Sequence, residues 1–305
     1  MKNFLSRKHL LPLAVCLLSL SGVAFAGTQR RNTPAVSPGV LPRSWPHGEP
    51  GCAGVPQFHL HPYNDDLYIL RQSGCSNYEK PFLYLIFGRD KVLLLDTGAG
   101  ATDVARTVKI VIERWLAARR LRSIALVVAH THTHGDHIGG DEQLKRLPGA
   151  TVVAPELEAV RSFFGLRRWP EGIAQYDLGG RILDLIPIPG HEATSIAVYD
   201  RQTAILFTGD TLYPGRLYVE APDAFIHSIR RLVEFTRDKP VTHILGAHIE
   251  NKRTPYEDYP VRTTYQPHEH SLELGRSHLL ELNDALARMR GRVVKRIMRD
   301  FTIWP

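Results

Sequence analysis

Residues 130–137, HTHTHGDH, contain four histidines and one aspartate in eight positions. Imidazole nitrogens and carboxylate oxygens are the ligands that hold zinc and related divalent metals. His132 and His134 alternate at the end of an apolar run, so both side chains can point to one side and hold one ion. Asp136 and His137 follow on the turn and face a second position. A polar loop that happens to be rich in histidine is the alternative, but four residues of metal-ligand type in the pattern HxHxDH favour a metal site.

Further ligand types occur where other apolar runs end. Asp96, His191, Asp210 and His248 each follow such a run and are accompanied by a glycine. Strand ends at one rim of a sheet converge in space, and glycine lets the backbone crowd around a small ion. Each of the last three alone would more often be an ordinary polar group. Together with the cluster at 130–137 they predict one shared site.

Asp96 admits two interpretations. It ends the run Leu93-Leu94-Leu95, so it could simply cap the loop that follows. Its position at the end of a buried strand favours a supporting role, in which it holds a ligand histidine or the metal loop through hydrogen bonds.

The hydrophobic pattern predicts alternating strands and helices that would place these residues. Strands are expected at 57–61, 67–71, 82–87, 91–96, 124–129, 151–154, 182–188, 196–200, 204–208 and 242–245. Helices are expected at 102–120, 141–147 and 155–164, with a further one capped by Asp223.

The ordered set of motifs is specific. It consists of HxHxDH at 132–137, Pro189-Gly190-His191, Gly209-Asp210-Thr211 and His248, with Asp96-Thr97-Gly98 upstream. This set resembles that of the metallo-β-lactamase superfamily, over roughly residues 57–250. The resemblance implies an α/β fold, the four-layer αβ/βα sandwich, in which two sheets pack face to face with helices outside and metals at one edge.

The resemblance also implies a role for seven side chains as metal ligands. They are His132, His134 and His191 for the first metal, Asp136, His137 and His248 for the second, and Asp210 as a bridge between them. Two zinc ions are the expected cofactors, with iron or manganese as alternatives. His130 lies outside the pattern, because only the pair 132–134 has Asp and His at the right distance behind it.

The residue type at position 210 also indicates which branch of the superfamily this chain resembles. True β-lactamases of this fold usually carry cysteine or serine there, whereas aspartate resembles glyoxalase II-like thioesterases, lactonases, phosphodiesterases and nucleases. The implied reaction is hydrolysis of an ester, thioester, lactone or amide by a hydroxide shared between two metals. Asp136 would be the catalytic residue that orients the hydroxide and passes its proton to the leaving group.

Four alternatives remain. An iron-dependent redox enzyme of the same fold, similar to persulfide dioxygenases, is the first, and a β-lactamase is the second. A nucleic-acid-processing enzyme is disfavoured by the charge of the mature chain, which has 35 basic and 31 acidic residues after removal of the first 26. A small-molecule substrate is expected, and the substrate, the metal bound in the cell and the oligomeric state are left open. A non-catalytic binding module ranks last, since no ligand is missing.

The N-terminus has the features of a secretory signal peptide. Basic residues precede the apolar run 10–24, which ends in Ala24-Phe25-Ala26, so we predict cleavage after Ala26, a periplasmic or secreted protein, and no stable membrane anchor afterwards. The mature chain keeps Cys52 and Cys75, which in an exported protein could form a disulfide; either could instead be a buried thiol.

The remaining segments complete the domain prediction. Residues 27–56 carry six prolines and are expected to be an extended leader, with order beginning near Gln57. Residues 57–250 form the main domain, and 251–305 a C-terminal helical extension packed on it. Two sets of residues are given no function here: Tyr213, Arg216 and Tyr218, which could close over substrate or be ordinary loop residues, and His268, His270 and His278, which are expected at the surface.

Overall fold

The computed structural model describes residue 1, residues 36–46 and residues 51–305. Two units are distinguished, Met1–Pro34 and Ala35–Pro305, and the second contains every helix and strand given below. The predicted signal peptide lies outside the described residues, apart from Met1. Among the described helices, none combines the length and the apolar character that a membrane span requires.

Two six-stranded sheets and one three-stranded sheet make up the β-structure. The first sheet follows chain order: β1 (Phe58–Asn64), β2 (Leu67–Gln72), β3 (Phe82–Phe87), β4 (Lys91–Leu95), β5 (Ala125–Ala129) and β6 (Thr151–Val152). The second runs β13 (Glu273–Leu274), β12 (His243–Gly246), β10 (Ile205–Gly209), β9 (Ile196–Asp200), β8 (Ile182–Pro187) and β7 (Ala174–Asp177). The small sheet is β11 (Arg216–Tyr218), β15 (Thr302–Trp304) and β14 (Arg296–Ile297).

The strand directions bring several strand ends to one rim. In the first sheet β4 and β5 are parallel neighbours. In the second sheet β10 and β12 are parallel, and β8 runs the same way because both β8 and β10 are antiparallel to β9. The loops that leave these strands therefore collect at shared edges, as the predicted site requires.

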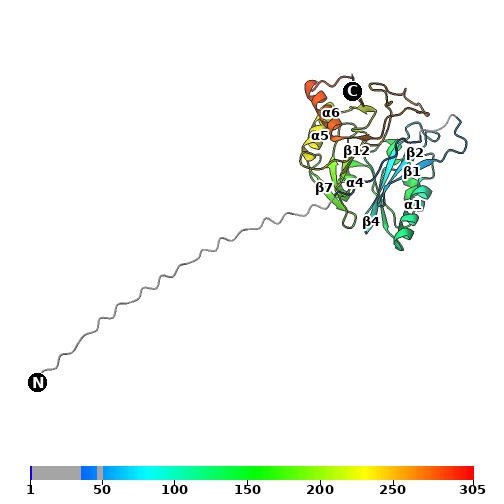
Figure 1. Cartoon of the computed structure of the whole chain (residues 1–305), viewed down its shortest axis with the longest axis vertical. Helices are drawn as coiled ribbons and strands as arrows, with labels where there is room; N and C mark the ends of the chain where they lie inside the picture. Colours follow the sequence, from blue (N-terminus) through cyan, green and yellow to red (C-terminus); the bar gives the residue numbers. More distant parts are fainter. Residues whose placement is uncertain (2–35, 47–50) are drawn as a thin grey trace. The chain divides into compact units, whose positions relative to one another are not determined.

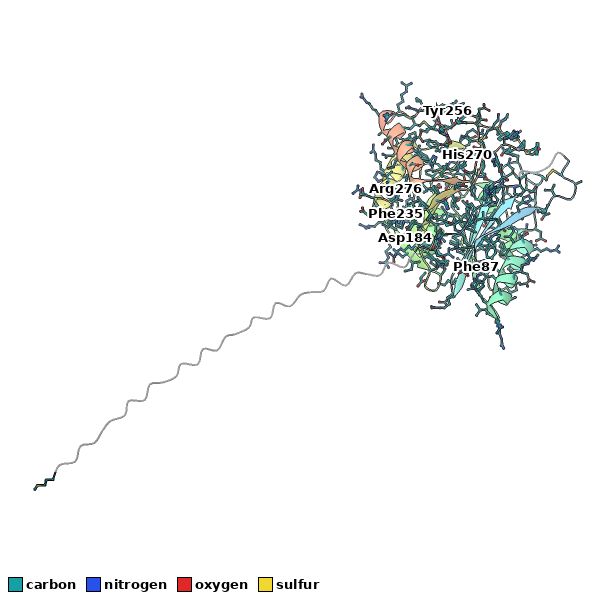
Figure 2. The ribbon with its side chains drawn as sticks, viewed as in Figure 1. Phe87, Asp184, Phe235, Tyr256, His270 and Arg276 are labelled. Atoms are coloured by element: carbon teal, nitrogen blue, oxygen red, sulfur yellow. A yellow bond between two sulfur atoms is a disulfide. The ribbon has the colours of Figure 1, made fainter. Side chains whose placement is uncertain are left out.

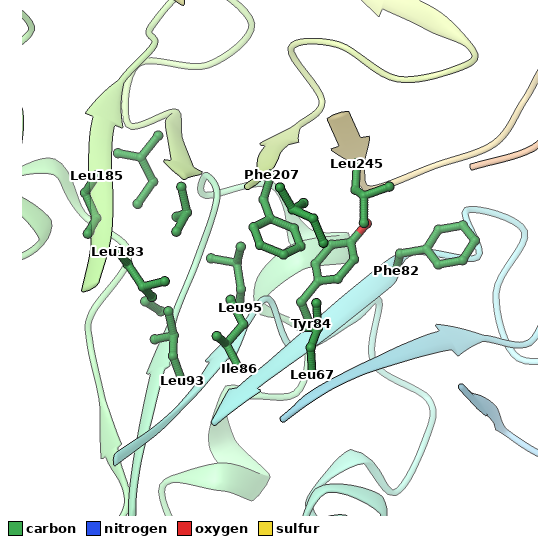
Figure 3. Packing of buried hydrophobic residues seen from close by; sticks show 14 of the residues in the cluster. Leu67, Phe82, Tyr84, Ile86, Leu93, Leu95, Leu183, Leu185, Phe207 and Leu245 are labelled. Atoms are coloured by element: carbon green, nitrogen blue, oxygen red, sulfur yellow. The ribbon is translucent and has the colours of Figure 1, made fainter. Parts of the chain in front are cut away.

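Each central strand is buried on both faces, and its alternating side chains enter two different cores. Ile86 and Leu93 face the second sheet, whereas Leu85 and Leu94 face the opposite way. Figure 3 shows the core between the sheets. Its labelled residues come from both sheets: Leu67, Phe82, Tyr84, Ile86, Leu93 and Leu95 from the first, and Leu183, Leu185, Phe207 and Leu245 from the second.

Helices cover the outer faces. On the first sheet lies α1 (Val104–Arg119), whose Trp115 stacks on Phe87 with ring centroids 4.6 Å apart. On the second lie α5 (Pro222–Phe235) and α6 (Arg276–Arg288), whose apolar faces share one core with that sheet. The short helices are α2 (Gly135–Ile138), α3 (Asp141–Leu144) and α4 (Leu157–Phe164). The layers are helix, sheet, sheet and helix, so the predicted αβ/βα sandwich is confirmed (Figure 1).

The leader departs from its prediction. Residues 36–46 pack on the sandwich: Trp45 is 3% exposed and lies edge-on to Phe82, with centroids 4.9 Å apart. The amide of Val40 donates to the carbonyl of Tyr63 at 2.9 Å. The expectation that order begins near Gln57 is therefore wrong for these residues. Their prolines predicted an extended leader, but the buried Trp45 holds the segment against the sandwich.

The C-terminal segment also differs in part. Its helix is present, but the segment adds a strand to the second sheet and two strands to the small sheet, so it is not only helical. It runs through the upper part of the view, where Figure 2 labels Tyr256 and His270. Asp223 lies in the first turn of α5 instead of capping it, and Ala221 is the N-cap residue.

A disulfide joins Cys52 and Cys75, with the two sulfurs 2.02 Å apart. It tethers the loop between β2 and β3. Inside that loop Ser73 accepts from the amides of Ser76 and Asn77, at 3.0 and 3.2 Å. The loop is thus held by a covalent bond and by its own turns.

Removing this cross-link is expected to destabilise the fold. The double variant Cys52→Ser, Cys75→Ser should lose about 3 kcal/mol of unfolding free energy, since the disulfide closes a separation of 23 residues and restricts the unfolded chain. Urea unfolding measures this. A reductant should shift the wild type by the same amount and leave the double variant unchanged; equal stability of the two oxidised proteins would contradict the expectation.

Candidate metal centre

The structure brings the seven predicted ligands together at one rim of the sandwich. They form two groups within which the ligand atoms lie no more than 4.8 Å apart: His132, His134 and His191 in one, and Asp136, His137, Asp210 and His248 in the other. The residues follow β5, β8, β10 and β12, or lie on α2 just after β5. Five of the seven side chains are buried; His134 is exposed and Asp136 is intermediate.

The first group consists of imidazoles alone. Nδ1 of His134 is 3.0 Å from Nε2 of His132 and 3.2 Å from Nε2 of His191. His191 donates its Nδ1 proton to the carbonyl of Tyr218 at 3.0 Å, which leaves the lone pair of its Nε2 directed toward the group. Three ring nitrogens that converge at such distances can coordinate one cation.

Asp210 lies between the two groups and faces both. Its Oδ2 is 3.9 Å from Nε2 of His132 and 3.7 Å from Nε2 of His191. Its Oδ1 is 3.5 Å from Nε2 of His137 and 3.4 Å from Nε2 of His248. One oxygen is thus directed to each group, which is the geometry of a carboxylate that bridges two cations.

Asp96 and Thr131 orient the second group from behind. Oδ2 of Asp96 is 2.9 Å from Nδ1 of His137, and an ionised carboxylate can only accept, so Nδ1 carries the proton and Nε2 faces the site. Oδ1 of Asp96 accepts from the amide of Thr131 at 2.7 Å. Asp96 therefore has the position of a supporting residue, completely buried behind the ligands.

Two backbone carbonyls orient further histidines. Nδ1 of His248 donates to the carbonyl of Glu79 at 2.9 Å, and Tyr218 does the same for His191. Neither contact could be predicted from residue types, because every residue has a backbone carbonyl. Thr131 was also missed, and its hydroxyl lies 3.1 Å from Nδ1 of His132.

Glycines next to the ligands allow the close packing. Gly209 has φ +51°, and a Cβ there would come within 2.7 Å of Cβ of Thr131. Gly190 has φ +140°, and a Cβ would lie 2.4 Å from the backbone of Phe225. Both conformations favour glycine, so the positions of Asp210 and His191 depend on the glycine that directly precedes each of them.

The residues fit divalent cations. Nε2 of His137 and Oδ1 of Asp210 are buried atoms with no hydrogen-bond partner among the described residues, although both point into the second group. Unpaired buried polar atoms are costly, and a cation would satisfy both. Imidazole nitrogens and carboxylate oxygens together are the donors preferred by zinc and its neighbours.

The two groups hold protons differently when metal-free. Burial lowers the pKa of His132 well below its usual value, and it also lowers that of His191. Burial opposes protonation of His137 and His248 too, but the carboxylate of Asp210 and its neighbours outweigh it and raise the pKa of both well above the usual value. In the first group His132 and His191 therefore favour the neutral imidazole, whereas in the second group His137 and His248 favour the protonated form.

His130 is not part of either group. Its Nε2 pairs with Oδ1 of Asp141 at 2.8 Å, and its side chain is buried. Two of the histidines expected at the surface are instead partly buried, because His270 and His278 share Asp300 at 3.1 and 3.2 Å. His268 is exposed.

The residues after Asp210 are structural in part. The guanidinium of Arg216 binds Glu250 and Asp258, each at 2.7 Å, and is 4% exposed. The hydroxyl of Tyr213 donates to the carbonyl of Arg216. All three line a cavity of about 250 Å³ that opens onto the metal groups, and Tyr218 is the least buried of them.

Comparison with known proteins agrees with this geometry. The sequence model of the metallo-beta-lactamase superfamily matches residues 81–248, and the chain belongs to that superfamily. A hydroxyacylglutathione hydrolase from Brucella ovis is 35% identical over 111 residues, which are 35% of this chain and 43% of that protein. The chain thus aligns with less than half the length of such curated relatives.

Solved structures show the same fold at low identity. A metallo-beta-lactamase from Pontibacter korlensis has a TM-score of 0.50 with 19% identity, and covers 76% of this chain and 99% of its own. TMB-1 has a TM-score of 0.51 with 14% identity, and covers 77% of this chain and 100% of its own. The superfamily and the curated relatives indicate a metal-dependent hydrolase, and the His/Asp groups indicate that it binds a divalent metal.

Replacing Asp96 tests its support of the second group. In Asp96→Asn the amide nitrogen faces Nδ1 of His137 and drives the ring proton to Nε2, where it opposes a cation, so metal affinity there should fall about 10- to 100-fold. Competition with a chromogenic chelator measures it. Asp141→Asn is the matched control, since Asp141 pairs with His130 instead, and it should leave the affinity unchanged; an equal loss in both variants would contradict this role.

Metal binding should also depend on pH in two ways. Because the pKa values of His137 and His248 are raised, a cation entering the second group displaces protons, so its affinity falls as pH decreases from about 8 to about 6. The first group, in which the pKa values of His132 and His191 are lowered, should change less over this range. Zinc titration by calorimetry in buffers of different ionisation heat measures the released protons. Identical pH slopes for the two steps would exclude this difference.

Proposed function

We propose that this protein is an exported hydrolase with two zinc ions, one in each group. The position of Asp210 carries the proposal, because its two oxygens face separate groups at 3.4–3.9 Å and no single cation would use both. When bound, such a metal pair supplies a water of lowered pKa and stabilises negative charge on the substrate oxygen.

Asp136 is the proposed proton carrier. Its Oδ2 lies 3.2 Å from Nε2 of His248 and 3.4 Å from Nε2 of His137. Burial raises the pKa of this carboxyl, but the two histidines outweigh burial and hold it well below its usual range. Asp136 is therefore ionised, lines the cavity, and can accept a proton from water and deliver it to a leaving group.

The proposed bond is an ester, thioester, lactone or amide. The name of the Brucella relatives, hydroxyacylglutathione hydrolase, supports an acyl compound as the first choice. Those relatives align over only part of their length, so glutathione itself is not carried over. A polar cavity of about 250 Å³ agrees with a small-molecule substrate.

Export is proposed from two features. The N-terminal sequence has the pattern of a secretory signal, and Cys52 and Cys75 are paired, as expected in an oxidising compartment. Cell fractionation with detection of a C-terminal tag would test it: the proposal predicts a mature form cut after Ala26 outside the cytoplasm, and full-length protein in the cytoplasm would refute it.

A hydrolysis panel tests the enzyme activity. Acyl thioesters, homoserine lactones, aryl phosphodiesters and nitrocefin should be assayed on zinc-loaded protein with and without chelator. We expect hydrolysis of an acyl substrate that chelator abolishes and zinc restores. Asp136→Asn should lower kcat about 100- to 10,000-fold, while the control Asp141→Asn, outside both metal groups, keeps it.

Two results would contradict the proposal. Activity that persists after complete metal removal is the first. The second is stoichiometric iron in protein purified without added metal, together with thiol-dependent oxygen uptake, which would favour the redox enzyme of the same fold.

A further inference from the structure

Lys80 lies in the wall of the cavity that also exposes Asp136, Asp210 and His248. It is one of the largest fully buried side chains, with 2% of its surface exposed. Nζ donates to the carbonyl of Thr263 at 2.8 Å. No carboxylate in the described part of the chain comes within the 4.0 Å ion-pair distance of this ammonium.

A buried ammonium without a paired carboxylate is costly. Burial, with the nearby Arg71 as the next cause, lowers the pKa of Lys80 to about 8. The residue also has φ +49°, a left-handed conformation that glycine or asparagine adopts more easily. An apolar side chain of similar length would avoid the desolvation cost, so packing does not explain this lysine. Uncompensated desolvation and backbone strain of this kind are found most often at sites that bind ligands.

Among the described residues that line the cavity, Lys80 is a buried cation that has no carboxylate at ion-pair distance. Arg216 also lines the cavity, but Glu250 and Asp258 neutralise it. Arg262 and Glu220 are exposed at the rim. An ammonium has three N–H donors, and Thr263 takes one, so two remain for a ligand.

The backbone next to Lys80 is fixed to the metal centre. Glu79, its neighbour, supplies the carbonyl that orients His248. The amide of Glu79 in turn bonds to Oδ1 of Asn77 at 2.9 Å, and the same loop carries the disulfide at Cys75. The loop that carries Lys80 is thus tied by these bonds to His248 in the second group.

We propose that Lys80 binds a carboxylate of the substrate, so the preferred substrates are acyl compounds that carry a second, anionic carboxyl group. Two remaining N–H donors match the two oxygens of one carboxylate. A single ammonium suits a monoanion better than a phosphate dianion. This inference rests on the proposed hydrolase function and names the substrate class of the same site.

A matched pair of substrates tests it. The S-phenyl thioester of glutaric acid carries the free carboxylate, and its methyl ester does not. For wild type we expect a higher kcat/KM with the acid. In Lys80→Met that value should fall about 10- to 100-fold, mainly through KM, as for the loss of a charge-assisted hydrogen bond. The methyl ester should change less than about twofold.

Lys252→Met is the control variant, because it removes a positive charge that pairs with Glu257 and does not line the cavity. It should leave both substrates unchanged. Thermal unfolding of Lys80→Met should occur at the wild-type temperature or above. Equal losses for the acid and the methyl ester, or no preference for the acid in wild type, would overturn the inference.

Binding separates this inference from the proposed function. Calorimetry on metal-free protein, with monomethyl glutarate and dimethyl glutarate as probes, should show binding of the monoanion that Lys80→Met weakens at least tenfold. If wild type hydrolyses neither these thioesters nor any substrate of the hydrolysis panel but shows this binding, the hydrolase proposal fails and the carboxylate site stands. If the monoanion binds both proteins equally, the carboxylate site fails whatever the activity.

Discussion

The structure depends on one carboxylate that faces two sets of histidines. Asp210 can take this position because Gly209 lets the chain turn against Thr131, where a side chain would collide. The histidines reach it because the ends of β5, β8, β10 and β12 meet at one rim. The proposed hydrolysis requires that cations occupy both groups.

The sequence predicted the central architecture well, and for physical reasons. Strands such as β3 are buried on both faces and appear as continuous apolar runs, and ligand histidines and aspartates at their ends stand out by type. The αβ/βα sandwich is confirmed. The structure also gathers the predicted ligands at one rim, which is the arrangement that the spacing of the motifs implied.

Some features of the site could not be predicted, because the type of the residue involved does not distinguish them. The carbonyls of Glu79 and Tyr218 orient two ligands, and any residue could supply them. Strands of two or three residues, such as β11 and β14, are too short for a hydrophobic period. Lys80 resembles a surface lysine until its burial is known.

The cavity wall is only partly contained in the segment that matches the superfamily model, which also supplies Tyr213, Arg216, Tyr218 and Glu220. The superfamily model matches residues 81–248 and so includes all seven ligands. Lys80 lies just before this range, and Glu250, Arg262 and Thr263 lie after it. The matched segment thus contains the predicted metal ligands, and the flanking segments add Lys80, Glu250, Arg262 and Thr263 to the cavity wall.

The most direct test of the central claim is a crystal structure of the zinc-loaded protein with anomalous scattering recorded on both sides of the zinc absorption edge. The account predicts two zinc peaks, one among His132, His134 and His191 and one among Asp136, His137 and His248, with one oxygen of Asp210 at each. A single peak, or Asp210 turned away from either metal, would contradict it.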